Sequence, residues 1–239
     1  MPSNSNEILG KRLLVVVAHP DDESFLVSGT THENRRRGGV AWLICATAGE
    51  HGRAYLQRPV TPAQMKVIRT RELRAVAKHL GVARLFCLGL PDKGVEKRSG
   101  ALRRRTTAIA RDFHPDYILS FGPDGISGHT DHIATGLAAR QAARKLHVPF
   151  LAFTLPPKLV ANAHQWMRKR RKHGSYSDRI HYSKPTVKIV IVRSVKWKAM
   201  SLHRSQLRAG RPFDTIPRFA AVEFLKAEYF VSSKGNEDI

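Results

Sequence analysis

The fold is decided by a stretch near the start of the chain, Val15-Val16-Val17-Ala18-His19-Pro20-Asp21-Asp22-Glu23. The valines are apolar without alternation, which is typical of a buried strand in a parallel sheet. Pro20 cannot continue a hydrogen-bonded ladder, so the strand must end there. The three acids suit the first turn of a helix, where negative charge meets the positive end of the dipole. We therefore expect His19 and the acids just past the carboxyl end of an early strand, where open α/β sheets bind ligands.

His19 and Asp22 stand three residues apart across a tight turn and carry side chains that bind metals. An imidazole nitrogen and a carboxylate oxygen are both good ligands for a divalent cation such as zinc. Asp21 lies between them, so its carboxylate can point elsewhere and stay free to accept a proton. A competing interpretation is that Asp21 and Asp22 only cap a helix. Taken alone, the stretch favours neither interpretation.

The composition is that of a globular protein with one large domain. The chain has 239 residues, of which 42% are hydrophobic, enough for a sizeable core. No apolar run approaches membrane-spanning length, and no signal-peptide core follows the polar residues 1–6. Cys45 and Cys87 lie in apolar stretches without a partner at metal-ligand spacing. They are most simply buried free thiols, so we expect a cytoplasmic protein.

The formal net charge of +22 is unusual for an enzyme of this size, and part of it is clustered. The basic groups are Arg35-Arg36-Arg37, Arg103-Arg104-Arg105 and Arg168-Lys169-Arg170-Arg171-Lys172. Such charge attracts nucleic acid, anionic lipid or an acidic substrate. Because no recognised nucleic-acid motif accompanies it, a solvated basic surface is the favoured interpretation.

Strands and helices alternate along the chain, which predicts parallel βαβ units. Strands are expected at 12–18, 40–46, 85–88, 117–120, 149–154 and 186–192, and helices at 23–37, 62–80, 102–111, 133–146 and 197–207, before a mixed segment at 218–231. The predicted fold is a single-domain, Rossmann-like three-layer α/β sandwich with a mostly parallel sheet and the active site at the strand carboxyl ends. The domain is expected at 11–231, with an insertion at 155–185, a flexible tail at 1–10 and a second tail at 232–239.

A second polar cluster follows the predicted strand at 117–120, in the segment Gly128-His129-Thr130-Asp131-His132. His132 supplies a third metal ligand, and two histidines with one carboxylate leave a coordination position for water, as in catalytic zinc sites. His129 is placed to stabilise an oxyanion or to protonate a leaving amine. Asp131 can fix the tautomer of one histidine through a hydrogen bond. The alternative is that these are only ordinary polar residues at a helix start. It becomes improbable because both clusters are expected at the same sheet edge.

The chain resembles the LmbE/PIG-L family of metal-dependent N-deacetylases. Two segments carry the resemblance, Ala-His-Pro-Asp-Asp-Glu at 18–23 and Gly-His-x-Asp-His at 128–132. Weaker matches follow in the family's order, and together they cover about residues 12–230: Thr47-x-Gly49-Glu50-x-Gly52, Arg69-x-x-Glu72-Leu73, Leu80-Gly81-Val82, Pro91-Asp92, Pro115-Asp116, and Lys198 with His203-x-Ser205-Gln206.

The resemblance implies a set of roles. His19, Asp22 and His132 would bind zinc, with iron(II) or another divalent ion as an alternative. The general base would be Asp21, and His129 would assist at the tetrahedral intermediate.

The resemblance also implies a binding pocket. Arg69 and Asp92 would hold sugar hydroxyls, and Glu50 would line the pocket. Without the family, Arg69 is more simply a solvated helix charge and Asp92 a plain turn residue. The substrate would be a small N-acetylglucosamine-type amino sugar or related amide.

Two hypotheses therefore compete. The first is a zinc-dependent amidase that deacetylates an amino sugar, whose basic surface steers an anionic substrate where there is one. The second is a nucleic-acid or anionic-surface binding protein on a retired enzyme fold. The filled catalytic positions favour the first. The sequence leaves open whether the protein forms a homo-oligomer.

Overall fold

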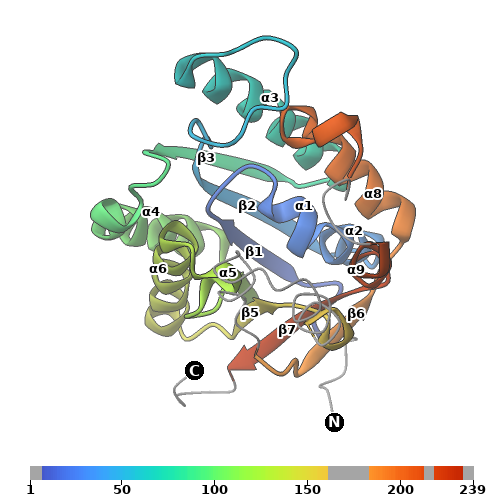
Figure 1. The fold of residues 1–239 in the computed structure, drawn as a ribbon. Helices are drawn as coiled ribbons and strands as arrows, with labels where there is room; N and C mark the ends of the chain where they lie inside the picture. Colours follow the sequence, from blue (N-terminus) through green and yellow to red (C-terminus); the bar gives the residue numbers. More distant parts are fainter. Residues whose placement is uncertain (1–6, 161–182, 213–217, 234–239) are drawn as a thin grey trace.

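A computed structural model describes residues 7–160, 183–212 and 218–233. The basic run at 168–172 and most of the segment predicted as an insertion lie outside the described residues. Within them, seven strands form one sheet in the order β3-β2-β1-β4-β5-β7-β6 (Figure 1). The strands are β1 (Arg12–Val17), β2 (Val40–Thr47), β3 (Arg84–Leu90), β4 (Tyr117–Phe121), β5 (Phe150–Thr154), β6 (Val187–Val190) and β7 (Ala227–Ser233).

The first five strands pair in parallel, and β7 pairs antiparallel with both β5 and β6. This confirms the predicted Rossmann-like sheet that is mostly parallel. The helices are α1 (Asp22–Leu26), α2 (Ser28–Arg36), α3 (Pro62–Leu80), α4 (Ser99–Phe113), α5 (Gly125–Gly128), α6 (Thr130–Leu146), α8 (Arg193–Leu202) and α9 (Arg218–Phe224).

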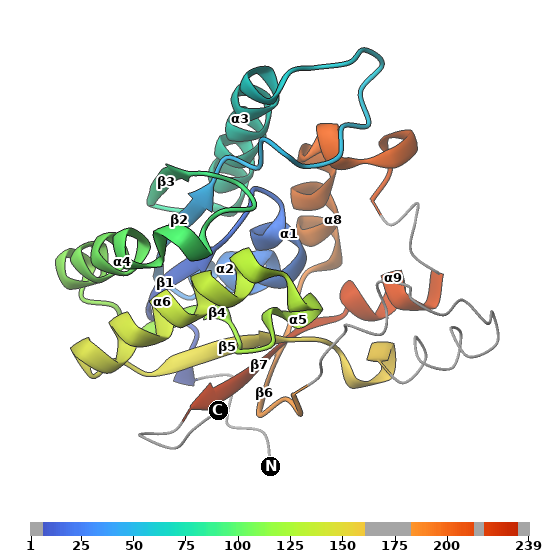
Figure 2. The ribbon, with the colours of Figure 1, turned by 60° about the vertical axis from the view of Figure 1, so that its left-hand side comes forward.

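Two apolar cores lie on the two faces of the sheet and explain the layers. Along β1, Leu13 and Val15 contribute to one core, while Leu14 and Val16 contribute to the other. The first core includes Leu73 of α3, and the second includes buried residues of α4 and α6. Figure 2 shows α4 and α6 on one side of the sheet and α2, α3 and α8 on the other. Since β1 is buried on both faces, its uninterrupted apolar run follows directly from its central position.

Three predicted elements differ from the structure. The helix expected at 23–37 is broken at Val27, whose φ of -147° and ψ of 8° separate α1 from α2. The helix expected at 197–207 begins earlier, as α8, and ends at Leu202 before a short 3₁₀ turn, η4 (Arg204–Gln206). The mixed segment at 218–231 contains α9 and β7, which inserts between β5 and β6. That pairing joins distant segments, so local periodicity could not predict it.

The folded part of the chain begins before the predicted boundary at residue 11. Ile8 and Leu9 are buried in the first apolar core, although residues 1–10 were expected to form a tail. At the other end, β7 extends to Ser233, past the predicted start of the second tail. Leu155, Leu159 and Val160, at the start of the predicted insertion, form a small buried cluster.

The strand order reverses direction between β1 and β4, which lie side by side in the centre of the sheet. Such a switch point opens a crevice at the strand carboxyl ends, where α/β proteins bind their ligands. His19 follows β1, and His132 lies in α6, which follows β4. Both predicted clusters therefore meet at this point. Within the described residues, every helix is too short or too polar to cross a membrane.

Candidate metal centre

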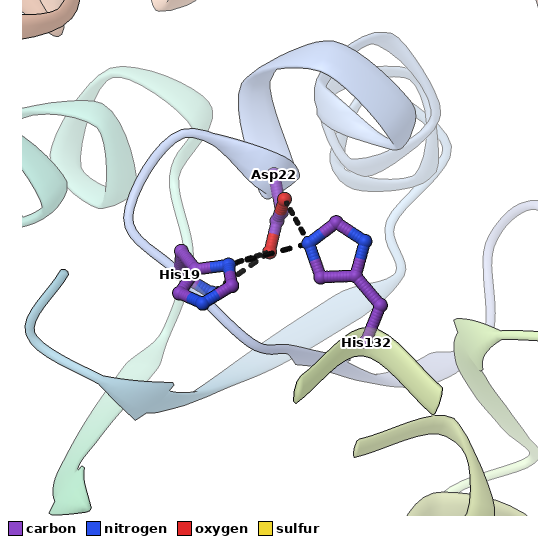
Figure 3. A group of neighbouring side chains, drawn as sticks. All are labelled: His19, Asp22 and His132. Atoms are coloured by element: carbon purple, nitrogen blue, oxygen red, sulfur yellow. Dashed lines mark hydrogen bonds and ion pairs between the residues drawn. The ribbon is translucent and has the colours of Figure 1, made fainter. Parts of the chain in front are cut away.

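Three side chains from the two strand ends converge on one another (Figure 3). Nδ1 of His19 lies 3.2 Å from Nε2 of His132 and 3.7 Å from Oδ2 of Asp22. The second oxygen of Asp22, Oδ1, lies 3.4 Å from Nε2 of His132. The structure thus brings together the three residues that sequence reasoning assigned to one metal ion.

The spacing of these atoms fits a divalent cation. The ligand atoms of His19, Asp22 and His132 all lie within 4.8 Å of one another. Ligands of a tetrahedral zinc ion, at about 2.0–2.2 Å from the metal, lie roughly 3.3–3.6 Å apart. The observed separations are close to that range. Three protein ligands also leave a fourth position for solvent or substrate, as catalytic zinc sites require.

Hydrogen bonds set the tautomers of both histidines. Nδ1 of His132 lies 3.0 Å from the carbonyl oxygen of Gly125, which can only accept, so the lone pair of His132 is on Nε2. Nε2 of His19 lies 3.2 Å from Oδ2 of Asp131 and 3.3 Å from Oδ1 of Asp92. It therefore carries the proton, and Nδ1 presents its lone pair to Asp22 and the metal position. The orienting contact expected of Asp131 is made with His19.

The surrounding carboxylates make this position favourable for positive charge. Burial alone would lower the pKa of His19, but the carboxylates of Asp131 and Asp92 outweigh it and raise the pKa to about 10. Burial would raise the pKa of Asp22, but the His132 imidazole beside it holds that pKa well below its usual range. A site that stabilises a proton so strongly will also stabilise a cation that replaces the proton.

A second group of donors shares His19. His19, His129 and Asp131 also offer ligand atoms within 4.8 Å of one another. The fully buried carboxylate of Asp131 is already engaged, because it accepts the backbone N–H of Lys93 at 2.7 Å and that of Val95 at 3.0 Å. These bonds hold Asp131 against His19 as an orienting group. The first group is therefore the candidate metal site.

Asp21 occupies a strained backbone position between the two ligands. Its φ is 122° and its side chain makes no capping hydrogen bond. The carboxylate of Asp22 accepts the backbone N–H of His19 at 2.8 Å, so it points back toward β1 rather than into the helix. The structure therefore does not bear out the capping interpretation. Non-glycine residues with such a φ cost about 1–3 kcal/mol and cluster at functional sites.

The carboxylate of Asp21 is held by Arg69. Nη2 of Arg69 lies 3.0 Å from Oδ2 of Asp21 and also donates to the carbonyl oxygen of Pro20, while Nη1 donates to that of Gly49 at 2.9 Å. Burial raises the pKa of Asp21, and the Arg69 guanidinium opposes this only in part. A raised pKa suits a group that must accept a proton near neutral pH.

His129 caps α6 and faces both histidine ligands. Its Nδ1 accepts the backbone N–H of Asp131 at 3.2 Å. Its ring centroid lies 4.9 Å from those of His19 and His132. Burial and the two neighbouring imidazoles lower its pKa. With Nδ1 used as an acceptor, the neutral ring carries its proton on Nε2, where it can donate. The helix-start interpretation describes its position correctly, and the catalytic role remains a prediction.

The predicted substrate-binding residues lie around the candidate metal ligands, and they differ in how far they are exposed. Arg69 is 3% exposed, and a Cβ at Gly49 or Gly52 would lie 2.2 or 2.4 Å from its Nη1. The glycines of the loop after β2 are therefore needed to admit this guanidinium. Arg69 contacts Asp21 and the backbone here, and its contact with a sugar stays a prediction.

Asp92 and Glu50 lie together beside His19. The backbone N–H of Asp92 donates to Oε1 of Glu50 at 3.0 Å, and Oδ2 of Asp92 accepts the N–H of His51 at 2.8 Å. Burial opposes ionisation of Asp92, but His19 lowers its pKa to about 2. Oε2 of Glu50 is buried and has no hydrogen-bond partner among the described residues. The position of Glu50 as a residue that lines a substrate pocket stays a prediction.

Sequence reasoning did not assign a role to Glu23 or His203, which form a buried pair next to Asp21. Each of the two side chains is 1% exposed. Glu23 was interpreted only as a first-turn acid, and His203 only as part of a weak match. Their contact spans 180 positions of sequence, so no local pattern could have found it.

Comparison with known proteins identifies a family. A profile described as "PIG-L: GlcNAc-PI de-N-acetylase" matches residues 14–143. A probable N-acetyl-α-D-glucosaminyl L-malate deacetylase 2 of Bacillus anthracis is 37% identical over 134 residues, which are 55% of this chain and 59% of that protein. A 1D-myo-inositol 2-acetamido-2-deoxy-α-D-glucopyranoside deacetylase of a Mycobacterium strain is 32% identical over 62% of this chain and 55% of its own length. The chain thus spans less than two thirds of these relatives.

Solved structures share the fold. The N,N'-diacetylchitobiose deacetylase of Pyrococcus horikoshii superposes with a TM-score of 0.63 at 20% identity, over 93% of this chain and 84% of that one. The 4-carboxy-2-hydroxymuconate hydratase of Pseudomonas putida also reaches 0.63, at 18% identity, over 96% and 99% of the two chains. At such identities the likeness establishes the fold alone, and the two neighbours carry out different reactions.

Proposed function

The chain belongs to the PIG-L family, and from this premise we propose that it is a metal-dependent hydrolase that removes an N-acetyl or related acyl group from a GlcNAc-type amino sugar. One observation carries the proposal. His19 and His132 each present a ring nitrogen lone pair beside the Asp22 carboxylate, because their other ring nitrogens are bound by Asp131 and Gly125.

The residues around the ligands have the functional groups that amide hydrolysis needs. A zinc ion held by His19, Asp22 and His132 would lower the pKa of water to about 7 and polarise the amide carbonyl. Asp21, with its raised pKa, would take a proton from the attacking water. Nε2–H of His129 would donate to the developing oxyanion or to the leaving amine.

Arg69 and Asp131 would support these steps from outside the reacting atoms. Arg69 fixes the direction of the Asp21 carboxylate through the ion pair at 3.0 Å. Asp131 keeps the proton of His19 on Nε2, so that Nδ1 stays available to a cation. Both groups keep the base and the ligands in place before the substrate binds, which lowers the reorganisation needed in the transition state.

The proposed substrate is a small N-acetylated amino sugar or its conjugate, as the names of the relatives suggest. The unpartnered Oε2 of Glu50 and the carboxylate of Asp92 are the groups proposed to accept sugar hydroxyls. We also propose a cytoplasmic location, in keeping with Cys45 and Cys87, which are neighbours on β2 and β3 and carry free thiols.

The basic surface gives less support to the nucleic-acid hypothesis. In the described residues, Arg36 pairs with Glu33 at 3.3 Å, and Arg105 donates to the carbonyl oxygen of Leu88 at 2.8 Å. Part of the clustered charge therefore acts within the fold. The described arginines still suit the steering of an anionic substrate, which would make turnover fall as ionic strength rises.

The proposal is tested by acetate release. Purified protein is stripped with a chelator, reloaded with zinc or iron(II), and incubated with N-acetylglucosamine and its malate, inositol and chitobiose conjugates. We expect equal amounts of acetate and free amine, and activity that returns only with metal. Absence of release from every sugar, together with hydration of an unsaturated carboxylic acid, would place the chain with the hydratase that shares its fold.

A further inference from the structure

A buried histidine outside the ligand group contacts the metal loop. His203 follows α8 and is 1% exposed. Its Nε2 lies 2.6 Å from Oε1 of Glu23, which is equally buried and stands next to the ligand Asp22. A charge-assisted bond of this length between two fully buried groups is strong. It ties the C-terminal part of the chain to the turn that carries the ligand and the base.

Glu23 also contacts Asp21. Its second oxygen, Oε2, accepts the backbone N–H of Asp21 at 3.0 Å. Asp21 is the residue with the positive φ of 122°. A hydrogen bond to a charged group stabilises a structure by about as much as such a backbone conformation destabilises it. The Glu23 carboxylate is therefore strong enough to hold the strained turn.

The other side of His203 faces a second carboxylate. Nδ1 of His203 is buried, has no hydrogen-bond partner among the described residues, and lies 4.0 Å from Oε2 of Glu72. Glu72 is itself fixed, because its carboxylate accepts the N–H and the hydroxyl of Ser205, both at 2.7 Å. Burial would lower the pKa of His203, but the neighbouring carboxylates, Glu23 first among them, together outweigh burial and raise it. The ring of His203 thus lies between two carboxylates, and its contact with Glu23 at 2.6 Å fixes the position of that carboxylate.

We propose that His203, acting through Glu23, is a positioning residue that keeps Asp21 in the strained conformation in which its carboxylate meets Arg69. The inference rests on the proposed function, in which Asp21 is the base. It assigns a role to a contact that the proposed chemistry leaves unexplained. Among the described residues, the hydrogen-bonded route from His203 to the backbone of Asp21 runs through the Glu23 carboxylate.

Two substitutions of the same histidine separate positioning from general stability. In His203→Gln the amide nitrogen falls near the place of Nε2 and can still donate to Glu23. In His203→Asn the amide is too short to reach it. For His203→Asn we expect kcat to fall about 10–100-fold, the range for loss of such orienting contacts, with KM changed by less than about threefold and zinc bound in full. For His203→Gln we expect kcat within about fivefold of the parent.

The control is His79→Asn, which removes the bond of a half-buried histidine to the carbonyl oxygen of Val195 at 3.1 Å, away from the metal loop. It should leave kcat unchanged. Equal losses in His203→Asn and His203→Gln, or a fall in zinc content that matches the fall in kcat, would overturn the positioning role. So would an unchanged kcat in His203→Asn.

A crystal structure of zinc-loaded His203→Asn keeps the inference separate from the proposed function. We expect the Asp21 carboxylate to turn away from Arg69 while His19, Asp22 and His132 keep their places. An unmoved Asp21 would overturn the inference even if the parent protein releases acetate. If the parent releases none from any amino sugar, the proposed function fails, and the displacement of Asp21 alone decides whether His203 positions it.

Discussion

Two clusters of buried charged groups lie in the described residues, and they differ in how their charges are paired and in the backbone that carries them. In the first, Lys196 of α8 donates to Glu228 of β7 at 2.8 Å, and the carboxylate also accepts the N–H groups of Gly29 and Thr30 at the start of α2. Both side chains are 1% exposed and the backbone around them is unstrained. In the second, at the switch point, two residues near the ligands, Asp21 and Ile126, have positive φ values of 122° and 64°.

This difference distinguishes charged groups that stabilise the fold from charged groups that serve a function. Glu228 and Lys196 satisfy each other, and the pair joins three distant elements of the fold. At the switch point, the ring nitrogens of His19 and His132 that face Asp22 are the ones that carry the lone pairs, and the carboxylates around them favour a cation. Strain persists only where the surroundings over-determine it, and it marks sites of function. Substitutions should therefore affect stability in the first cluster and activity in the second.

The largest effect is expected from Asp21→Asn. The amide keeps the size of the side chain but cannot accept the proton from water, so kcat should fall about 10²–10⁴-fold, the usual contribution of a general base. Zinc content should stay the same, because Asp21 is not a ligand. The measurement is acetate release at saturating substrate, with metal content determined on the same sample.

The matched control for this prediction is Asp112→Asn. Asp112 also pairs with an arginine, Arg84, at 3.5 Å, but both side chains are more than half exposed. Its removal should change neither kcat nor stability measurably, since exposed ion pairs contribute about 0–1 kcal/mol. Full activity in Asp21→Asn would remove Asp21 from the mechanism and leave the strained turn without a chemical role.

The reverse pattern is expected for Lys196→Met. Loss of the cation leaves Glu228 buried without its ionic partner, which costs about 3–5 kcal/mol of unfolding free energy in buried pairs. Burial lowers the pKa of Lys196, and the Glu228 carboxylate opposes this. Activity per folded molecule should stay near that of the parent. Urea unfolding, with kcat measured in the same preparations, checks both statements.

Lys226→Met serves as the comparison. Lys226 also lies 2.7 Å from a glutamate, Glu223, but its side chain is 59% exposed. We expect a loss of less than about 1 kcal/mol there. Partial recovery of stability in the double variant Lys196→Met, Glu228→Gln would show that the unpaired carboxylate causes the loss. If Lys196→Met lowered kcat instead, the division between the two clusters would fail.

The sheet could be predicted from sequence because its strands carry strong local signals. Val15 to Val17 lie in the central strand, and their apolar run ends at Pro20, so the position of His19 followed from the chain alone. The C-terminal part could not be predicted in this way. Glu228 precedes Tyr229 and Phe230 in β7, next to the edge strand β6. Its carboxylate is buried because Lys196 and the backbone at the start of α2 bind it. Tertiary contacts determine the conformation of that segment.

The same limit applies to the site. The ligand set could be predicted because His19, Asp22 and His132 each follow a strand end, and parallel strands bring their carboxyl ends together. The support of the site could be predicted only in part, through the contact of Asp131 with a histidine. Arg69 was assigned only to a sugar, and its ion pair with Asp21 beside the glycine loop was not predicted. His203 meets Glu23 across 180 positions. Contacts between segments so far apart leave no local pattern in a sequence.

The smallest of the three effects is expected from Asp131→Asn. The carboxylate accepts from Nε2 of His19 at 3.2 Å, which keeps the lone pair of His19 on Nδ1. An amide at this position can donate to Nε2 and so favour the wrong tautomer. Since loss of such orienting contacts costs about 10–100-fold in metal affinity or activity, the zinc dissociation constant, measured by competition with a chelating dye, should rise by that factor.

The control for that measurement is Asp116→Asn, where an exposed carboxylate accepts a backbone N–H, that of Arg12 at 2.7 Å, at the opposite end of β1 from His19. Zinc affinity should be unchanged there. If Asp131→Asn binds zinc as tightly as the parent, the tautomer of His19 is not set by Asp131. The contact of His19 with Asp92 at 3.3 Å would then have to fix it alone, and Asp131→Asn with Asp92→Asn would be needed to weaken the metal. That outcome would move Asp92 from the proposed sugar contacts to the support of the ligand, so the substrate pocket would begin beyond it, at Glu50.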